Sequence, residues 1–430
     1  MHYFSTNRSC PNVSFRQALM DGQPSDKGLY FPCEIPRFDK GYIDRFGSKQ
    51  NAEIAFDVIR PYITPEIAEN DLFAICEETV NFDFPLVPIT DRISALELFH
   101  GPTLAFKDVG ARFMSRCLRH FSRENSDRTL IIVATSGDTG GAVAAGFHGV
   151  EGIDVVILFP KGKVSKVQDL QLTTFGGNVT TLELHGTFDD CQALAKQALA
   201  DRELQARVNI TSANSINVGR WLPQQFYYFF ALKQWEGRPP VISVPSGNFG
   251  NLASGLLAWR SGLPVKRFIA ACNANDVVPR FMKSDKYSPQ PSIETLSNAM
   301  DVGDPSNFVR ILELFRRDIH KLRDQLSAES ISDEDTAETM RQVFEQYGYI
   351  LDPHGAVGFR ALSNHFSIDE DQKGIFLETA DPVKFDKVNE IIGDEVPRPA
   401  AIKDLYSRKR SSIEIKPEYK AVRDILFSKL

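Results

Sequence analysis

The segment of residues 99–110 places a lysine in an apolar setting, an environment in which an amine can become reactive. Lys107 follows a Gly101-Pro102 turn, and from Leu104 onwards apolar residues recur at three- and four-residue spacings. Lys107 is therefore expected in the first turns of a helix. A charged ammonium is costly among apolar groups, so the pKa of Lys107 should fall, and a neutral amine can form a Schiff base with an aldehyde cofactor. A surface lysine that extends along its apolar neighbours is the alternative interpretation.

A glycine-rich loop, Ser246-Gly247-Asn248-Phe249-Gly250, lies between a predicted strand at 241–244 and a predicted helix at 252–259. Glycines let backbone N–H groups turn towards one point, and the start of a helix adds positive potential, so this loop can hold a phosphate. No Gly-Lys-Ser/Thr follows, so the loop is not a Walker A loop, and it does not match the dinucleotide-binding fingerprint. A tight strand–helix turn without a ligand explains the loop equally well.

Two further loops carry polar groups where predicted strands end. Ser136-Gly137-Asp138-Thr139-Gly140 is a second strand–loop–helix turn, in which Asp138 could cap the helix. The segment 214–220 follows a predicted strand at 208–211 and contains Ser215 and Arg220. A hydroxyl and a guanidinium five residues apart across a turn can converge on a phosphate, and the planar fork of arginine suits that ligand. A surface ion pair is the alternative for Arg220.

The chain resembles the threonine synthases through a specific string. Residues 100–108 read His-Gly-Pro-Thr-Leu-Ala-Phe-Lys-Asp, which is similar to the cofactor-lysine motif of that family of pyridoxal-phosphate (PLP) enzymes of the tryptophan-synthase-β type. The resemblance covers nearly the whole chain and implies that Lys107 binds PLP covalently. It also implies a cradle for the PLP phosphate, with Asn251 where the family often has Asp, formed by Gly247, Asn248, Phe249, Gly250 and Asn251.

The same resemblance implies two substrate-binding loops. The first receives the substrate carboxylate and comprises Ser136, Gly137, Asp138 and Thr139. The wider PLP group usually has Asn where Asp138 stands, whereas threonine synthases of the long type share the Asp. An aspartate is a poor neighbour for an anion, so backbone N–H groups and the Ser136 and Thr139 hydroxyls are expected to bind the carboxylate. The second loop binds the phosphate of O-phosphohomoserine through Ser215 and Arg220, with Asn217.

Thr379, at the end of a predicted strand at 375–379, is implied to hydrogen-bond the pyridine nitrogen of PLP. A neutral hydroxyl leaves that nitrogen largely unprotonated and so moderates the electron sink. The family commonly reads Gly-Thr-Ala-His-Pro, whereas this chain reads Glu378-Thr379-Ala380-Asp381-Pro382. Glu378 and Asp381 therefore depart from the pattern, and they raise the question of what replaces the histidine and how the cofactor's electrostatics are kept.

Strands and helices alternate from residue 129 onwards, which is typical of a parallel sheet covered by helices on both faces. This pattern predicts an α/β fold, and the resemblance implies the fold-type II of PLP enzymes. We expect three parts: a small N-terminal α+β domain at 1–80, a PLP-binding region of two lobes with the cofactor between them at 81–395, and a helical tail at 396–430.

The composition limits the range of functions. The chain has 430 residues and a net charge of −7, which disfavours nucleic-acid binding through bulk charge. Its apolar runs are too short to cross a membrane, and residues 1–7 contain no signal-peptide core. Six scattered cysteines without a C-x-x-C pair indicate reduced thiols in a cytoplasm and no metal site. We expect a cytoplasmic monomer or homodimer.

The resemblance implies a lyase that acts on a phosphate ester. The resemblance implies that it converts O-phospho-L-homoserine and water to L-threonine and phosphate, the last step of threonine biosynthesis, with Lys107 as the base. Two alternatives stay open. The first is a PLP-dependent phospho-lyase or dehydratase that uses the same loops. The second is a non-catalytic protein that binds a phosphate ligand, which the altered Asp381 would favour.

Overall fold

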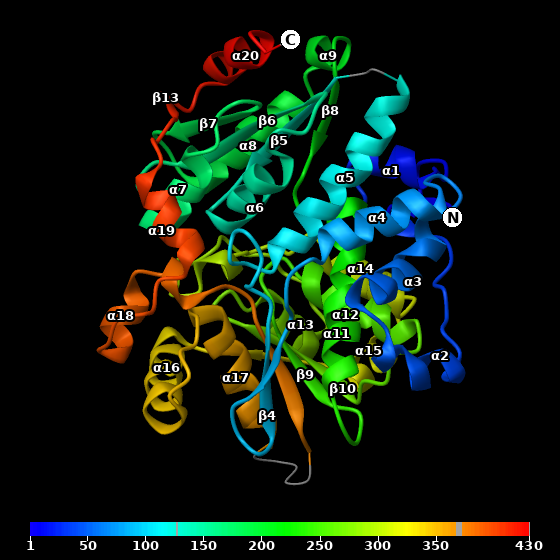
Figure 1. Ribbon diagram of the computed structural model, residues 1–430, viewed down its shortest axis with the longest axis vertical. Helices are drawn as coiled ribbons and strands as arrows, with labels where there is room; N and C mark the ends of the chain where they lie inside the picture. The colour runs from blue at the N-terminus through cyan, green and yellow to red at the C-terminus, as the bar shows by residue number, and fades with distance from the viewer. Residues whose placement is uncertain (126–127, 367–371, 430) are drawn as a thin grey trace.

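The chain folds around two mainly parallel sheets, which lie one above the other in Figure 1. The computed structural model describes residues 1–125, 128–366 and 372–429. The larger sheet has the order β11-β10-β9-β12-β4-β3, and only β3 runs antiparallel to its neighbour. Its strands are β3 (Leu86–Pro88), β4 (Ile93–Glu97), β9 (Val241–Pro245), β10 (Arg267–Cys272), β11 (Leu326–Ser330) and β12 (Gly374–Glu378).

The smaller sheet is parallel throughout, in the order β13-β7-β6-β5-β8. Its strands are β5 (Thr129–Ala134), β6 (Ile153–Pro160), β7 (Val179–Leu184), β8 (Asn209–Ser212) and β13 (Ile413–Ile415). Every residue of β5 and β7 is buried. β5 reads as a nearly continuous apolar run because helices cover both faces of a parallel sheet, and that is why the sequence predicts it well. β7 also buries the polar side chains of Thr180, Thr181 and Glu183.

Helices cover both sheets. In the larger lobe α17 packs against β9, β10 and β12, and α12 lies beside β9 and β10. In the smaller lobe α8 and α6 contact the sheet. The helices of the two lobes are α5 (Lys107–Asn125), α6 (Asp138–Phe147), α7 (Lys166–Thr173), α8 (Phe188–Leu199), α9 (Arg202–Gln205), α10 (Val218–Trp221), η2 (Leu222–Gln225), α11 (Phe226–Gln234), α12 (Gly250–Arg260), α13 (Val277–Ser284), η3 (Asn298–Met300), α14 (Phe308–Leu314), α15 (Ile319–Gln325), α16 (Asp333–Tyr347), α17 (Pro353–Phe366), η4 (Pro382–Lys384) and α18 (Lys387–Ile392).

The N-terminal unit, blue in Figure 1, is a two-stranded antiparallel sheet with helices. It comprises β1 (Tyr3–Ser5), α1 (Phe15–Asp21), β2 (Tyr30–Pro32), α2 (Lys40–Arg45), η1 (Phe46–Ser48), α3 (Asn51–Ile63) and α4 (Glu69–Thr79). Its apolar side chains share one core with α5, α10 and α11. The unit also contacts β8 of the smaller sheet through α1, so it is packed against both lobes rather than tethered to one.

The C-terminal tail, red in Figure 1, runs along the smaller lobe. It contains α19 (Ala400–Ser407) and α20 (Tyr419–Phe427), as expected for a helical tail, but it also supplies β13, which pairs with the edge strand β7. The prediction missed β13 because a three-residue strand between charged segments has no measurable period. In the described residues no helix is long and apolar enough to span a membrane, and no cluster of three metal-ligating side chains occurs.

Candidate active site

Lys107 is the first residue of α5, and the turn before it is fastened to the end of β12. Phe106 N donates a hydrogen bond to Thr379 O (2.9 Å), and Asp381 N donates to Leu104 O (3.1 Å). Leu104 has a left-handed backbone (φ 56°), which tightens the turn. These contacts bring Lys107 and Thr379, which are far apart in sequence, into one site.

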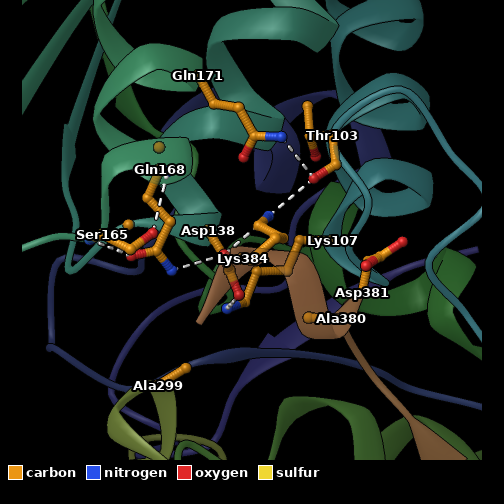
Figure 2. A network of polar contacts seen from close by, with 12 residues as sticks. Thr103, Lys107, Asp138, Ser165, Gln168, Gln171, Ala299, Ala380, Asp381 and Lys384 are labelled. Carbon is orange, nitrogen blue, oxygen red and sulfur yellow. Dashed lines mark hydrogen bonds and ion pairs between the residues drawn. The ribbon is translucent and has the colours of Figure 1, made fainter. Parts of the chain in front are cut away.

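Side chains from three elements hold the same turn. Thr103 donates from N and Oγ1 to the carboxylate of Asp108, at 2.9 and 2.6 Å. Its carbonyl oxygen accepts hydrogen bonds from Gln171 Nε2 (2.9 Å) on α7 and from Lys384 Nζ (2.8 Å) on η4. The turn that presents Lys107 is therefore fixed by α5, α7 and η4 at once, and Figure 2 shows the contacts of Thr103 with Gln171 and Lys384.

Asp138 lies between two lysines (Figure 2). Its Oδ1 is 2.8 Å from Lys384 Nζ and accepts a hydrogen bond from Gln168 Nε2 (3.0 Å), and its Oδ2 is 3.7 Å from Lys107 Nζ. Burial alone would favour the neutral acid, but the Lys384 and Lys107 ammoniums hold the pKa of Asp138 well below its usual range. Asp138 is thus a buried carboxylate whose charge is already balanced.

The side chain of Lys107 is 16% exposed. Burial lowers the pKa of its amine, and the positive charges of Lys384 and Arg220 act in the same direction, whereas Asp138 opposes them. The expected lowering of the lysine pKa is confirmed in direction and in its main cause. The structure therefore favours a reactive amine over a surface lysine.

The loop at 135–140 is organised by a hydroxyl. Thr135 Oγ1 accepts hydrogen bonds from Gly137 N (3.0 Å) and Gly140 N (2.9 Å), and α6 begins directly afterwards. Asp138 does not cap α6, because Gly137 holds the N-cap position and the Asp138 side chain faces Lys384. Ser136 and Thr139 remain partly exposed at this loop, so they stay the predicted contacts for a substrate carboxylate.

The glycine-rich loop joins β9 to α12 and is closely packed. A Cβ on Gly247 would lie 2.5 Å from Met300 Cα, so no other residue fits there. Phe249 has φ 61° and is the N-cap residue of α12. Asn251, in the first turn of α12, accepts a hydrogen bond from Tyr228 on Oδ1 (2.8 Å), and its buried Nδ2 has no partner among the described residues. A glycine cradle, a helix start and a free amide donor fit a bound phosphate.

The residues of the 214–220 loop that are predicted to bind the substrate phosphate differ from one another in their surroundings. Ser215 Oγ accepts hydrogen bonds from Asn248 Nδ2 (2.7 Å) and Asn307 Nδ2 (3.2 Å), so this loop touches the glycine-rich loop directly. Asn217, in contrast, caps α10 through Gly219 N (2.9 Å) and donates to Leu19 O (2.9 Å) and Ser212 O (3.3 Å). Asn217 therefore holds the loop, and its predicted contact with substrate is not supported.

Arg220 is a buried cation without a carboxylate partner in the described residues. It is 3% exposed and donates to Ala213 O (2.5 Å), while its Nε has no hydrogen-bond partner. Burial lowers its pKa to about 10. A Cβ on Gly110, one turn after Lys107, would lie 3.0 Å from Arg220 Nε, so that glycine gives the guanidinium room beside the lysine. The surface ion-pair alternative is excluded, and an anion near Lys107 would complete the site.

Known proteins match this arrangement over the whole chain. Residues 91–376 match the model of the pyridoxal-phosphate-dependent enzymes, residues 2–80 that of the threonine synthase N terminus, and residues 355–426 that of the threonine synthase C-terminal part. A threonine synthase from Serratia marcescens is 47% identical, with 91% of this chain and 90% of the relative covered. One from Escherichia coli is 42% identical, with 97% of each covered.

The chain belongs to the threonine synthase family. Solved structures agree: that of threonine synthase from Escherichia coli has a TM-score of 0.93 at 40% identity and full coverage of both chains. That of PLP-bound threonine synthase from Brucella melitensis has a TM-score of 0.92 at 35% identity, covering 99% of this chain and 98% of that one. The predictions of the family, of the fold-type II architecture with a small N-terminal domain, and of PLP as cofactor are confirmed.

Two positions depart from the usual threonine synthase motif, and the structure explains both. Asp381 accepts a hydrogen bond from Val383 N (2.9 Å) and caps η4, the turn that carries Lys384. Glu378 is fully buried; its Oε1 accepts from Asp352 N (2.6 Å), and its Oε2 lies where a Cβ on Gly355 would be, 1.5 Å away. Burial raises the pKa of Glu378 well above its usual value, so the site favours the neutral form of this carboxyl.

Sequence reasoning missed two buried side chains that contact predicted site residues. Lys384 follows the Thr379 motif by five residues and is completely buried beside Asp138; a lysine directly after an Asp-Pro turn is the signal that could have drawn attention to it. Arg310 on α14 is also fully buried, and it donates to Ser215 O (3.2 Å) and Ile216 O (2.6 Å) in the predicted substrate loop. Nothing near Arg310 in the sequence points to that contact.

Proposed function

We propose that this threonine synthase acts on O-phospho-L-homoserine and water and releases L-threonine and phosphate. The observation that carries the proposal is Arg220, a buried guanidinium beside Lys107 with no carboxylate partner in the described part of the chain. A phosphate ester whose carbon chain reaches Lys107 would supply the missing anion. Arginine's fork holds a phosphate through parallel hydrogen bonds.

PLP, when held by Lys107 and the glycine-rich loop, supplies an electron sink at the substrate α carbon. The protein's own part begins with Lys107, whose lowered pKa lets its amine take the α proton and later return it. Thr379 is the residue proposed to face the pyridine nitrogen. Burial raises the pKa of the neighbouring Glu378 carboxyl, which disfavours a negative charge beside Thr379.

The charges around Asp138 resolve the difficulty of an aspartate in a carboxylate-binding loop. Lys384 Nζ at 2.8 Å neutralises Asp138, so a substrate carboxylate at Ser136 and Thr139 meets no net negative charge. The start of α6 adds positive potential at the same loop. We infer that Lys384 is a positioning residue: it keeps Asp138 ionised and directed away from the anion.

The overall reaction balances without another reactant. The bond between the γ carbon and the ester oxygen breaks, and phosphate leaves with the electron pair towards Arg220 and Ser215. The oxygen of water bonds to the β carbon, and the other water proton leaves with the phosphate. Lys107 exchanges the protons lost from the α and β carbons: one returns to the α carbon and one is delivered to the γ carbon, which becomes the methyl group of threonine. An enzyme that released phosphate without adding water would be a phospho-lyase or dehydratase. Membership of an enzyme family with Lys107 in place argues against a non-catalytic role.

The test is a product assay on the PLP-loaded enzyme. With O-phospho-L-homoserine we expect equal amounts of phosphate and threonine, and 2-oxobutyrate in place of threonine would instead identify a lyase. Lys107→Ala should abolish both turnover and the visible absorbance of bound PLP. Lys196→Ala, at an exposed position on α8, is the matched control and should change neither. Continued turnover by the Lys107 variant would refute the assignment.

The proposal also covers location and assembly. We propose a cytoplasmic enzyme, which is supported by six cysteines that all carry free thiols. A monomer or homodimer remains the prediction for its assembly, and sedimentation velocity on the PLP-loaded enzyme would distinguish the two.

A further inference from the structure

A positively charged cavity lies between the N-terminal unit and the larger lobe. It is a cleft of about 860 Å³ that lies between the end of β2 with the segment after it, the end of α12, and α14 with the turn that follows it. Five arginines line it: Arg8, Arg37, Arg260, Arg316 and Arg317. We call this cavity the arginine cleft. None of its lining residues belongs to the active site described above.

The carboxylates in the arginine cleft do not balance its arginines. Glu313 on α14 is bound to Arg8 (2.7 Å) and to Arg317 (2.9 Å), and the only other acidic residue in the lining is Glu34. Within the described residues, no ion pair or side-chain hydrogen bond joins any partner to the remaining three arginines, Arg37, Arg260 and Arg316. A chain with a net charge of −7 thus concentrates unpaired positive charge in one cavity.

Arg260 shows this imbalance most clearly. It is the last residue of α12, and its Nε is buried without a hydrogen-bond partner among the described residues. Burial lowers the pKa of its guanidinium, and the charges of Arg37 and Arg316 lower it further. Unpaired buried donors are costly, and like charges repel each other. A bound anion would satisfy the Nε and remove the repulsion together.

The backbone directs two more arginines into the cleft. Arg316 and Arg317 follow α14 and have consecutive left-handed conformations, with φ of 53° and 59°. Such conformations are unfavourable for arginine and are found mainly where the surrounding structure or a ligand requires them. The aromatic ring of Phe31 and the side chain of Leu314 provide an apolar wall, so the cleft has both charged and apolar surfaces.

The arginine cleft is next to the clamp that holds the substrate loop. Arg310 on α14 donates to Tyr30 O on β2 (3.1 Å), as well as to Ser215 O and Ile216 O. The cleft is lined by Phe31, which follows Tyr30, and by Glu313, one helical turn after Arg310. A ligand that bridges β2 and α14 would therefore tighten the elements that Arg310 joins.

We propose that the arginine cleft binds a small polyanion carrying at least two phosphate or carboxylate groups, and that binding stabilises the Arg310 clamp on the substrate loop. Arginine binds both anions through the same pair of parallel hydrogen bonds. Two probes distinguish the two kinds of anion: inorganic triphosphate carries phosphate groups, and citrate carries carboxylate groups.

The first experiment is calorimetric titration of the PLP-loaded enzyme with each probe. We expect binding to the unmodified enzyme and to Arg220→Gln, because the active-site arginine takes no part. The double variant Arg260→Gln/Arg316→Gln should bind at least about tenfold more weakly. Arg202→Gln/Arg341→Gln, which removes two exposed arginines elsewhere, is the matched control and should bind normally. A difference between the probes identifies the preferred anion.

Two results would overturn the proposal. One is equal affinity of the unmodified enzyme and the cleft variant, and the other is loss of binding only in Arg220→Gln, which would locate the anion in the active site. If the double variant melts early, Arg37→Gln, at an exposed position, gives the same comparison. Amide hydrogen exchange of residues 213–217 should slow when triphosphate binds, and unchanged exchange would refute the link to the clamp.

Discussion

Replacing Lys384 with methionine should unbalance the charges around Asp138. The lysine is completely buried and lies 2.8 Å from Asp138 Oδ1. Removing one partner of a buried ion pair costs about 3–5 kcal/mol, because the other charge is left without compensation. Methionine has nearly the same length, so little of this loss comes from packing. We expect the free energy of unfolding of the PLP-free protein to fall by about that amount at pH 7.

A double-mutant cycle separates this loss from other effects. Asp138→Asn alone leaves Lys384 unpaired and should also destabilise the protein. The double variant removes both charges, so its loss should be smaller than the sum of the two single losses by at least about 2 kcal/mol. Chemical unfolding of the four proteins measures this coupling. Losses that simply add would refute the argument that Lys384 acts through Asp138.

The variant Lys384→Met also tests how Lys384 affects the pKa of the reactive Lys107. When Lys384 is replaced, Lys107, which lies 3.7 Å from Asp138, is the remaining ammonium partner of that carboxylate. The pKa of Lys107 should then rise, because the positive charge of Lys384 no longer repels its ammonium form. Capture of added PLP, followed by visible absorbance, should then require a higher pH than in the unmodified protein. An unchanged pH profile would mean that Lys384 has a structural role only.

Three further predictions concern the clamp and the buried carboxyl. Arg310→Lys should raise KM for O-phospho-L-homoserine by about tenfold with little change in kcat, because lysine cannot hold both carbonyls of the Ser215 loop; steady-state kinetics with an unchanged KM would contradict this. Gly355→Ala should lower the free energy of unfolding by about 1–3 kcal/mol, since its Cβ would lie 1.5 Å from Glu378 Oε2. Combining Gly355→Ala with Glu378→Gly should recover most of the lost free energy of unfolding. If thermal unfolding shows that the losses of the two single variants simply add, the proposed coupling between positions 355 and 378 is refuted. Burial raises the pKa of Glu378 in the folded protein. The contribution of its neutral form to the free energy of unfolding is therefore fully present below about pH 4.5, and it is lost as the pH rises towards the folded-state pKa. Glu378→Gln should therefore gain stability relative to the unmodified protein between pH 5 and pH 8, as measured by urea unfolding.

The parts of the fold that were predictable depend on local patterns. The strand β5 is fully buried and stands out as an apolar run. The position of Lys107 followed from a Gly-Pro turn and a helical stripe, both within ten residues of it. A three-residue strand such as β13 has no such pattern, so its pairing with β7 could not be anticipated.

The contacts that complete the site join distant segments, and no local pattern reports them. Lys384 reaches Asp138 only because the Leu104 turn and the end of β12 are hydrogen-bonded together. Asn217 was expected to bind the substrate phosphate only through the family resemblance, whereas in the structure it caps α10. An asparagine directly before a helix is typical of such a cap, but only the packing shows which groups its side chain contacts.

The position of β13 affects how the protein can be assembled during synthesis. It covers the edge of β7, and its residues lie near the C-terminal end of the chain. An emerging chain therefore has four of the five strands of the smaller sheet long before the strand that covers this edge. Uncovered strand edges are places where other chains can pair. Substitutions that delay the pairing of β13, or truncations that remove it, should thus lead to aggregation during expression, even though β13 lies far from the catalytic lysine.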